Sequence, residues 1–123
     1  MWQGQMDLLH VFSGKIWVID HKTTGNARYA LTPETIRENV QANVYAWAAS
    51  VLSGLPSVDL RWIYYLTTTT KKTWPVDVTI RAEDAESFLL SRVDGPAKRA
   101  LSLLKERPDP QTLPKNPAAC GAY

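Results

Sequence analysis

The feature that most constrains the fold is the apolar run Ile16–Ile19, which leads without a break into Asp20-His21-Lys22. Four apolar residues in succession predict a strand that is buried on both faces, in the middle of a sheet with helices against it. Ser13-Gly14 lies just before this run and is typical of a tight hairpin turn. We therefore expect a first strand over Gln5–Phe12 and a second over Ile16–Thr23, joined as a hairpin.

The rest of the chain alternates between helical and extended patterns. Thr32-Pro33 is typical of a helix start, since Thr caps a helix and Pro fits its first position, and Gly54 is typical of a helix end. Pro75 places the last strand at a sheet edge. The expected elements are a loop over Thr24–Leu31, a helix over Thr32–Gly54, strands over Val58–Thr67 and Trp74–Ile80, and a helix over Ala82–Arg107 that is interrupted at Asp94-Gly95-Pro96. This order predicts an α/β fold with a mixed central sheet of about four strands flanked by α-helices.

Apolar spacing predicts which side of each helix is buried. The first expected helix has an apolar stripe at Ile36, Val40, Val44, Trp47 and Val51. The second has its stripe at Phe88, Leu89, Val93, Leu101 and Leu104. We also expect the aromatic residues Trp47, Trp62, Tyr64 and Tyr65 to belong to the core.

Composition sets outer limits on the fold and its location. A chain of 123 residues, 45% apolar and 21% charged, predicts one folded domain, with a core in residues 1–107 and a proline-rich tail in 108–123. The single cysteine, Cys120, excludes an internal disulfide framework and indicates a reducing, cytoplasmic location. No apolar run has the length of a membrane span, so no membrane contact is expected. The net charge of +2 does not exclude nucleic acid, because a binding footprint is local.

The expected hairpin brings two carboxylates together. A two-residue turn at Ser13-Gly14 pairs Leu9 with Val18, and the same register extends to Asp7 opposite Asp20 and Gln5 opposite Lys22. Opposed carboxylates repel unless a cation lies between them, and hard oxygen ligands suit Mg²⁺ or Mn²⁺. With a lysine beside them, these groups can support hydrolysis of a phosphodiester. The other interpretation is a solvated ion pair at a strand end, and spacing alone leaves both open.

Three blocks of sequence carry a family resemblance. Gly4–Asp7 has the pattern G-x-x-D, Trp17–Thr23 is an apolar strand that ends D-x-K-T, and Gln41–Tyr45 has the pattern Q-x-x-x-Y. In this order they resemble the RecB-like branch of the PD-(D/E)XK nuclease superfamily, which includes phage exonucleases and CRISPR-associated RecB-like nucleases. The motifs span residues 4–45, and the order of elements extends the resemblance along the chain.

The resemblance implies roles for single residues. It makes Asp7 and Asp20 ligands of Mg²⁺ or Mn²⁺, with the main-chain carbonyl of His21 as a third ligand, and Lys22 the catalytic lysine. Gln41 and Tyr45 would line the site and contact nucleic acid or support Lys22; the alternative is an amphipathic pair beside the apolar stripe.

The chain also departs from the family pattern. Members usually have helices before the G-x-x-D block, whereas only three residues precede Gly4, so we expect a domain shortened at both ends. Asn116–Cys120 resembles the approach to the cysteine cluster of iron–sulfur members. One cysteine cannot supply the thiolates of such a cluster, so no complete iron–sulfur cluster is expected in this chain.

These observations predict a divalent-metal-dependent DNA nuclease, most simply an exonuclease, that acts on single- or double-stranded DNA. Lys71, Lys72 and Trp74 are further substrate-binding candidates, because an aromatic residue beside positive charge suits a nucleic-acid strand. The alternative is a catalytically incomplete module that binds DNA or docks on a helicase or another repair or recombination partner. A second copy of the chain is a further candidate partner, since it could replace missing elements.

Overall fold

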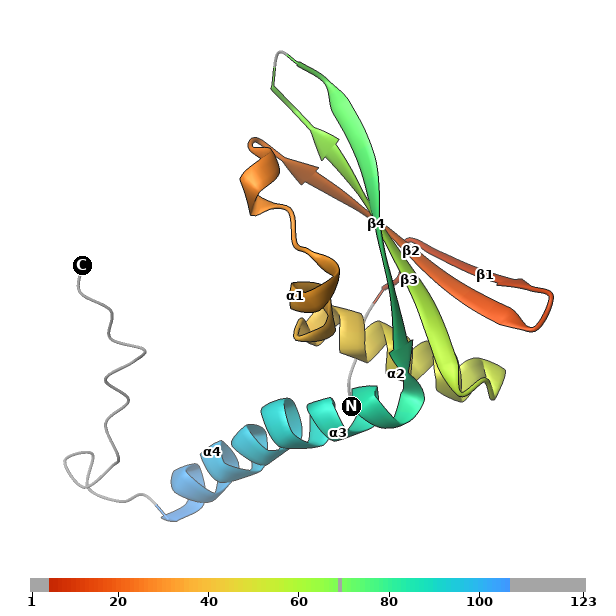
Figure 1. The fold of residues 1–123 in the computed structure, drawn as a ribbon. Helices are drawn as coiled ribbons and strands as arrows, with labels where there is room; N and C mark the ends of the chain where they lie inside the picture. The colour runs from red at the N-terminus through yellow and green to blue at the C-terminus, as the bar shows by residue number, and fades with distance from the viewer. Residues whose placement is uncertain (1–4, 69, 107–123) are drawn as a thin grey trace, which may run out of the picture.

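The computed structural model describes residues 5–68 and 70–106, which form a four-stranded sheet with helices packed beside it (Figure 1). The strands lie in chain order: β1 (Leu8–Phe12), β2 (Lys15–Thr24), β3 (Ser57–Leu66) and β4 (Lys72–Arg81). The outer pairs are antiparallel and the central pair β2–β3 is parallel. A parallel pair needs a crossover, which runs through η1 (Ala27–Tyr29), α1 (Pro33–Arg37) and α2 (Val40–Ser53). The predicted mixed sheet of four strands with flanking helices is confirmed, with β4 at an edge.

The β1–β2 hairpin has the predicted turn and register. Ser13 and Gly14 have φ angles of 51° and 71°, as a two-residue turn with two left-handed positions requires. Pairing runs from Phe12 with Lys15 to Leu8 with Ile19. The prediction that the strand begins at Gln5 is wrong, so neither Asp7 nor Gln5 extends the ladder opposite Asp20 and Lys22. The reason is that the Asp7 carboxylate, rather than a main-chain carbonyl, accepts the amide hydrogen of His21.

The expected helix over Thr32–Gly54 is in fact two helices. Thr32 caps α1 as predicted, within a capping box that Thr35 completes. The helix then breaks, and Asn39 caps α2 by accepting the amide hydrogen of Ala42 at 3.2 Å. The buried Asn43 amide donates to the carbonyls of Arg37 and Asn39, both at 2.8 Å, which satisfies main-chain groups that the break leaves without helical partners.

Small side chains, not the predicted stripe, form the buried face of α2. Ile36 is buried as expected, but Val40, Trp47 and Val51 are exposed. The buried residues of α2 are Ala42, Asn43, Tyr45, Ala46, Ala49 and Ser50. Alanines allow the helix axis to approach the sheet closely. Close packing, and not the number of large apolar residues on a face, therefore decides which side of α2 is buried.

Among the described residues, helices cover one face of the sheet and leave the other face open (Figure 1). Burial alternates along β2, with Ile16, Val18 and Asp20 buried, whereas Trp17 and Ile19 are only half-buried. The prediction of a strand buried on both faces is therefore wrong. The buried side chains of the other strands are Val58, Leu60, Trp62, Tyr64, Val78 and Ile80. Trp62 and Tyr64 are core residues as expected, but Tyr65 is exposed on the open face.

The last helical segment continues where an interruption was expected. α3 (Ala82–Leu89) leads through a π-helical turn, η2 (Leu90–Asp94), into α4 (Gly95–Glu106), and the Gly95 amide donates to the Leu90 carbonyl. Pro96 is the second residue of α4 and has no amide hydrogen to donate to the preceding turn, where the helix is π-helical.

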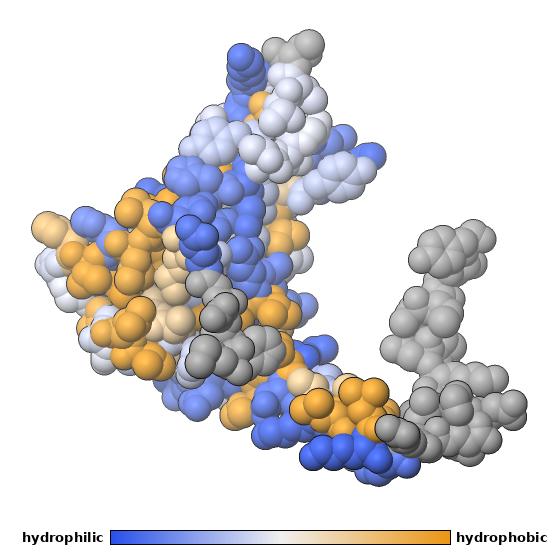
Figure 2. Space-filling model, turned by 180° about the vertical axis from the view of Figure 1, so that it is seen from behind, coloured by the Kyte–Doolittle hydropathy of each residue, from blue (hydrophilic) through white to orange (hydrophobic). Residues whose placement is uncertain are grey.

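Much of the predicted stripe of this segment is exposed. Leu101 and Leu104 are exposed and α4 has no buried residue, while Phe88, Leu89 and Val93 are half-buried. Figure 2 shows hydrophobic residues beside hydrophilic ones along α4. Within residues 5–68 and 70–106, no helix is both long and apolar enough to cross a membrane. Arg107, the proline-rich tail 108–123 and Cys120 lie outside the described residues.

A bidentate ion pair joins β3 and β4 on the open face. Arg61 Nε and Nη2 donate to Asp77 Oδ1 and Oδ2 at 2.8 and 2.7 Å, and the guanidinium lies 5.1 Å from the centre of the Trp17 ring. The hydrogen bonds from Arg61 lower the pKa of Asp77 from its ordinary value of 3.8. A carboxyl with a lowered pKa stabilises the fold above its unfolded pKa, and this contribution disappears as the pH falls through the folded pKa.

We predict that Ala46→Leu lowers the free energy of unfolding by about 1–3 kcal/mol, because a fully buried alanine against the sheet leaves no room for a larger side chain. Urea denaturation measures the change. Val51→Leu, at an exposed position of the same helix, should have little effect. Equal effects of both substitutions would contradict close packing of α2.

We predict that Asp77→Asn destabilises the protein at neutral pH by less than about 1 kcal/mol, because the Arg61 and Asp77 side chains are 39% and 45% exposed and water screens the pair. The difference should shrink as the pH falls below 3.8, the unperturbed value. Denaturation at several pH values measures it. In an Arg61→Met background, the effect of Asp77→Asn should lose this pH dependence, and a persistent dependence would assign it to another group.

Candidate active site

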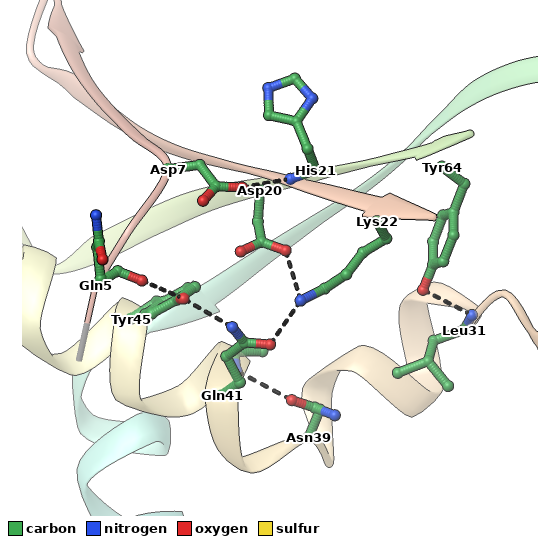
Figure 3. Close-up of polar contacts among 11 residues, drawn as sticks. Gln5, Asp7, Asp20, His21, Lys22, Leu31, Asn39, Gln41, Tyr45 and Tyr64 are labelled. Carbon is green, nitrogen blue, oxygen red and sulfur yellow. Dashed lines mark hydrogen bonds and ion pairs between the residues drawn. The ribbon is translucent and has the colours of Figure 1, made fainter. Parts of the chain in front are cut away.

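The centre of the candidate site is an ion pair on the covered face of β2 (Figure 3). Asp20 and Lys22 are two residues apart, so both side chains point toward α2. Lys22 Nζ lies 2.6 Å from Asp20 Oδ2; the Asp20 residue is 3% exposed and the Lys22 side chain 27%. No other donor among residues 5–68 and 70–106 reaches the buried Oδ2, so the Lys22 ammonium alone compensates its burial. The ion pair is therefore buried at Asp20 and accessible to solvent at Lys22.

A relay of hydrogen bonds connects Lys22 to α2 and to the chain before β1. Lys22 Nζ donates to Gln41 Oε1 at 2.7 Å, and Gln41 Nε2 donates to the Tyr45 hydroxyl at 2.7 Å. That hydroxyl donates to the main-chain carbonyl of Gln5 at 2.6 Å. Gln41 and Tyr45 lie one helical turn apart, so both reach the same site. The structure thus brings them together with Lys22, as Figure 3 shows, and each hydrogen bond fixes the direction of the next.

Asp7 lies beside Asp20 although it is outside the strand ladder. Its Oδ2 accepts the amide hydrogen of His21 at 2.8 Å, and this amide nitrogen is bonded to the carbonyl carbon of Asp20. Figure 3 shows the Asp7 side chain next to the Asp20 position on β2. Asp7 is exposed, whereas Asp20 is buried, so the candidate site lies at the border between solvent and the protein interior.

The His21 side chain lies on the opposite face of the sheet, as the sequence predicts. Its Nδ1 is 2.8 Å from the Tyr65 hydroxyl, and the two rings stack with their centres 5.6 Å apart. Only the main chain of His21 therefore faces the candidate site.

Sequence reasoning placed Trp62 in the core and did not include it in the site. Trp62 pairs with Asp20 in the parallel register between β2 and β3, and it is 2% exposed. Lys22 Nζ lies 4.7 Å from the centre of the Trp62 ring, within the range of a cation–π interaction. The pairing of β2 with β3 is a tertiary fact, so no local signal in the sequence identifies this contact.

A row of side chains connects Lys22 to the β3–β4 hairpin. Tyr64 pairs with Lys22 on one side and with Trp74 on the other, and the Tyr64 and Trp74 rings stack with centres 5.6 Å apart. The Leu31 amide donates to the Tyr64 hydroxyl at 3.0 Å, which fixes that ring.

Of the substrate-binding candidates on the hairpin, Trp74 is thus connected to the site face through Tyr64. Lys72 Nζ lies 5.9 Å from the centre of the Trp74 ring. Lys71, which is exposed, precedes β4. The three residues therefore lie at the end of the sheet toward which β2 runs from Asp20 to Lys22.

The donor set fits a small, hard divalent cation. Within the part of the chain that the structure describes, no three His, Cys, Asp or Glu side chains gather to hold a metal. Asp7 and Asp20 supply two carboxylates, and Mg²⁺ is commonly bound by one or two carboxylates with several waters retained. Asp20 Oδ2 already contacts the Lys22 ammonium at 2.6 Å, so a bound cation would share this carboxylate with Lys22.

We predict that Tyr45→Phe lowers the free energy of unfolding by about 1–3 kcal/mol, because it leaves Gln41 Nε2 and the Gln5 carbonyl without their partner in a part-buried relay. Chemical denaturation measures the loss. Tyr29→Phe is the control, since that hydroxyl accepts only an exposed bond from Arg28. A loss no larger than that of the control would show that the relay is not formed in solution.

Comparison with known proteins matches the chain to one family. The model of the PD-(D/E)XK nuclease superfamily matches residues 2–120 of the chain. No curated protein sequence and no solved structure matches it.

Proposed function

The chain belongs to the PD-(D/E)XK nuclease superfamily, and from this premise we propose that it is a divalent-metal-dependent deoxyribonuclease whose site is the Asp7–Asp20–Lys22 group. Members of this superfamily are nucleases that use divalent metals, typically Mg²⁺ or Mn²⁺. The observation that carries the proposal is the ion pair of Asp20 with Lys22, tied to Gln41 and next to Asp7.

Each residue of this group has a distinct role in the proposed reaction. Asp7, Asp20 and the main-chain carbonyl of His21 would hold Mg²⁺ or Mn²⁺, which supplies charge to activate water and to stabilise the phosphate in its transition state. Lys22 is the catalytic lysine: its ammonium positions the attacking water and offsets charge that develops on the phosphate oxygens. Gln41 and Tyr45 hold Lys22 in that place through their hydrogen bonds.

The reaction is the hydrolysis of a phosphodiester. The oxygen of a water molecule forms a bond to phosphorus while the bond from phosphorus to one sugar oxygen breaks. A proton leaves the attacking water, and the departing sugar oxygen gains one. The exposed side of Lys22 gives a phosphate access to the ammonium, whereas the buried Asp20 stays fixed.

The hairpin side chains supply the proposed binding surface. Trp74 offers an aromatic face for a base, and Lys71 and Lys72 offer charge for phosphates. These features suit a strand of DNA that passes from the hairpin toward Lys22, and the motif pattern supports the proposal that the protein belongs to the RecB-like branch. We propose exonuclease action, as in phage enzymes of that branch, and a second copy of the chain or a helicase as partner.

The test is cleavage of end-labelled single- and double-stranded DNA with Mn²⁺, Mg²⁺ or EDTA. We predict metal-dependent products, and a loss of about 100-fold or more in rate for Asp20→Asn and Lys22→Met, because each removes a charge that acts on the reacting phosphate. Asp77→Asn and Lys98→Met are matched controls, since these residues belong to exposed ion pairs elsewhere. Labelled products that become progressively shorter from one end of the DNA would show exonuclease action.

Two outcomes would contradict the proposal. Cleavage that persists in Lys22→Met would assign the activity to another site or to a contaminant. No cleavage by the parent protein, with DNA still bound, would favour a nuclease-fold module that binds DNA or docks on a partner.

A further inference from the structure

We propose that Trp62 is a positioning residue for Lys22, with the face of its indole ring holding the ammonium at the site. The inference rests on the proposed function, since it concerns how the catalytic lysine is placed. Neither the family motifs nor the predicted site include Trp62.

Within residues 5–68 and 70–106, three groups contact the Lys22 ammonium, and one of them is an aromatic ring. Asp20 Oδ2 lies at 2.6 Å, Gln41 Oε1 at 2.7 Å, and the centre of the Trp62 ring at 4.7 Å. The lysine side chain is a flexible four-carbon stem, so two short polar contacts leave the position of its ammonium relative to the DNA strand adjustable. The indole ring offers the ammonium an extended face instead of a single acceptor atom, and its π electrons attract the positive charge.

The chemistry of the indole argues against a role in filling the core alone. Trp62 Nε1 is buried and has no hydrogen-bond partner within residues 5–68 and 70–106. An unpaired buried N–H is unfavourable, and a phenylalanine or leucine at this position would avoid it. Tyr64, two residues along the same strand, has its buried hydroxyl paired with the Leu31 amide. The ring at position 62 is therefore better explained by what its face does for Lys22.

The ring contact is also independent of the carboxylate. The Asp20 oxygens that attract Lys22 are the atoms proposed to bind a divalent cation, and an oxygen shared with a second cation attracts the ammonium less. The attraction of the Lys22 ammonium to the Trp62 ring and to Gln41 does not change when the Asp20 carboxylate also binds another cation. Trp62 thus keeps Lys22 near its position with or without its carboxylate partner.

The first arm of the test is NMR of the full chain without metal or DNA. A lysine over an indole face has its Cε protons shifted upfield by the ring current, and Lys22→Arg assigns the signal. We expect this upfield shift in the parent, a smaller one in Trp62→Phe, and none in Trp62→Leu. Leu60→Ala is the matched control, because Leu60 is equally buried on the same face of β3 but pairs with Val18.

The second arm measures steady-state DNA cleavage with Mn²⁺. We expect kcat to fall about threefold in Trp62→Phe and roughly tenfold in Trp62→Leu, with KM changed less than about twofold, because the ring places the lysine and does not bind DNA. The folded fraction of the Leu60→Ala protein should have the same kcat as the parent protein.

The arms separate failure of this inference from failure of the proposed function. An unshifted Lys22 signal in the parent, or an upfield signal that persists in Trp62→Leu, overturns the ring contact. Parallel losses of kcat in Trp62→Leu and Leu60→Ala overturn the positioning role and leave a structural one. If the parent cleaves no DNA, the proposed nuclease fails, while the NMR arm still decides whether Trp62 places Lys22.

Discussion

The close approach of α2 to the sheet is the constraint on which the candidate site depends. Ala42, Ala46 and Ala49 are fully buried, so nothing larger than a methyl group separates the helix backbone from the strands at these positions. Gln41 can therefore reach Lys22 with a side chain of ordinary length, and its amide lies between the ammonium and the Tyr45 hydroxyl. Bulkier residues on this face would push the helix outward and break the relay, although each would bury more apolar surface.

The proposed function accounts for the buried charge of Asp20 better than a stabilising role does. Removing a carboxylate and an ammonium from water costs more than their attraction often returns, so a buried ion pair is weak evidence of a stabilising role. Apolar side chains at positions 20 and 22 would continue the core formed by Ile16 and Val18. The chain instead keeps a buried acid in contact with a lysine that is partly exposed to solvent. That arrangement is useful for binding a cation and a phosphate together.

Local rules predicted the hairpin turn, the start of α1 and the end of α2, whereas tertiary packing decided which faces are buried. Ser13-Gly14 has the required left-handed pair, and Gly54 ends α2 with φ of 72°, because these signals act over a few residues. The buried side of α2 could not be predicted, since Trp47 is more apolar than alanine but does not fit against the sheet. The contact of Trp62 with Lys22 depends on which strand pairs with β2, which is a long-range choice that leaves no local pattern.

The register of β2 determines both how the sheet pairs and on which face the candidate site residues lie. Side chains alternate along a strand, so a slip of one residue would move Asp20 and Lys22 to the open face and bring His21 under α2. The Ser13-Gly14 turn fixes the register on the β1 side, and eight pairs with β3 fix it on the other. Asp7 adds a third contact, because it lies just before β1 begins at Leu8, opposite Ile19, and its carboxylate accepts the His21 amide hydrogen. The residue proposed to complete the metal site is therefore also the one next to which the β1–β2 ladder stops, so the strand register determines where both carboxylates lie.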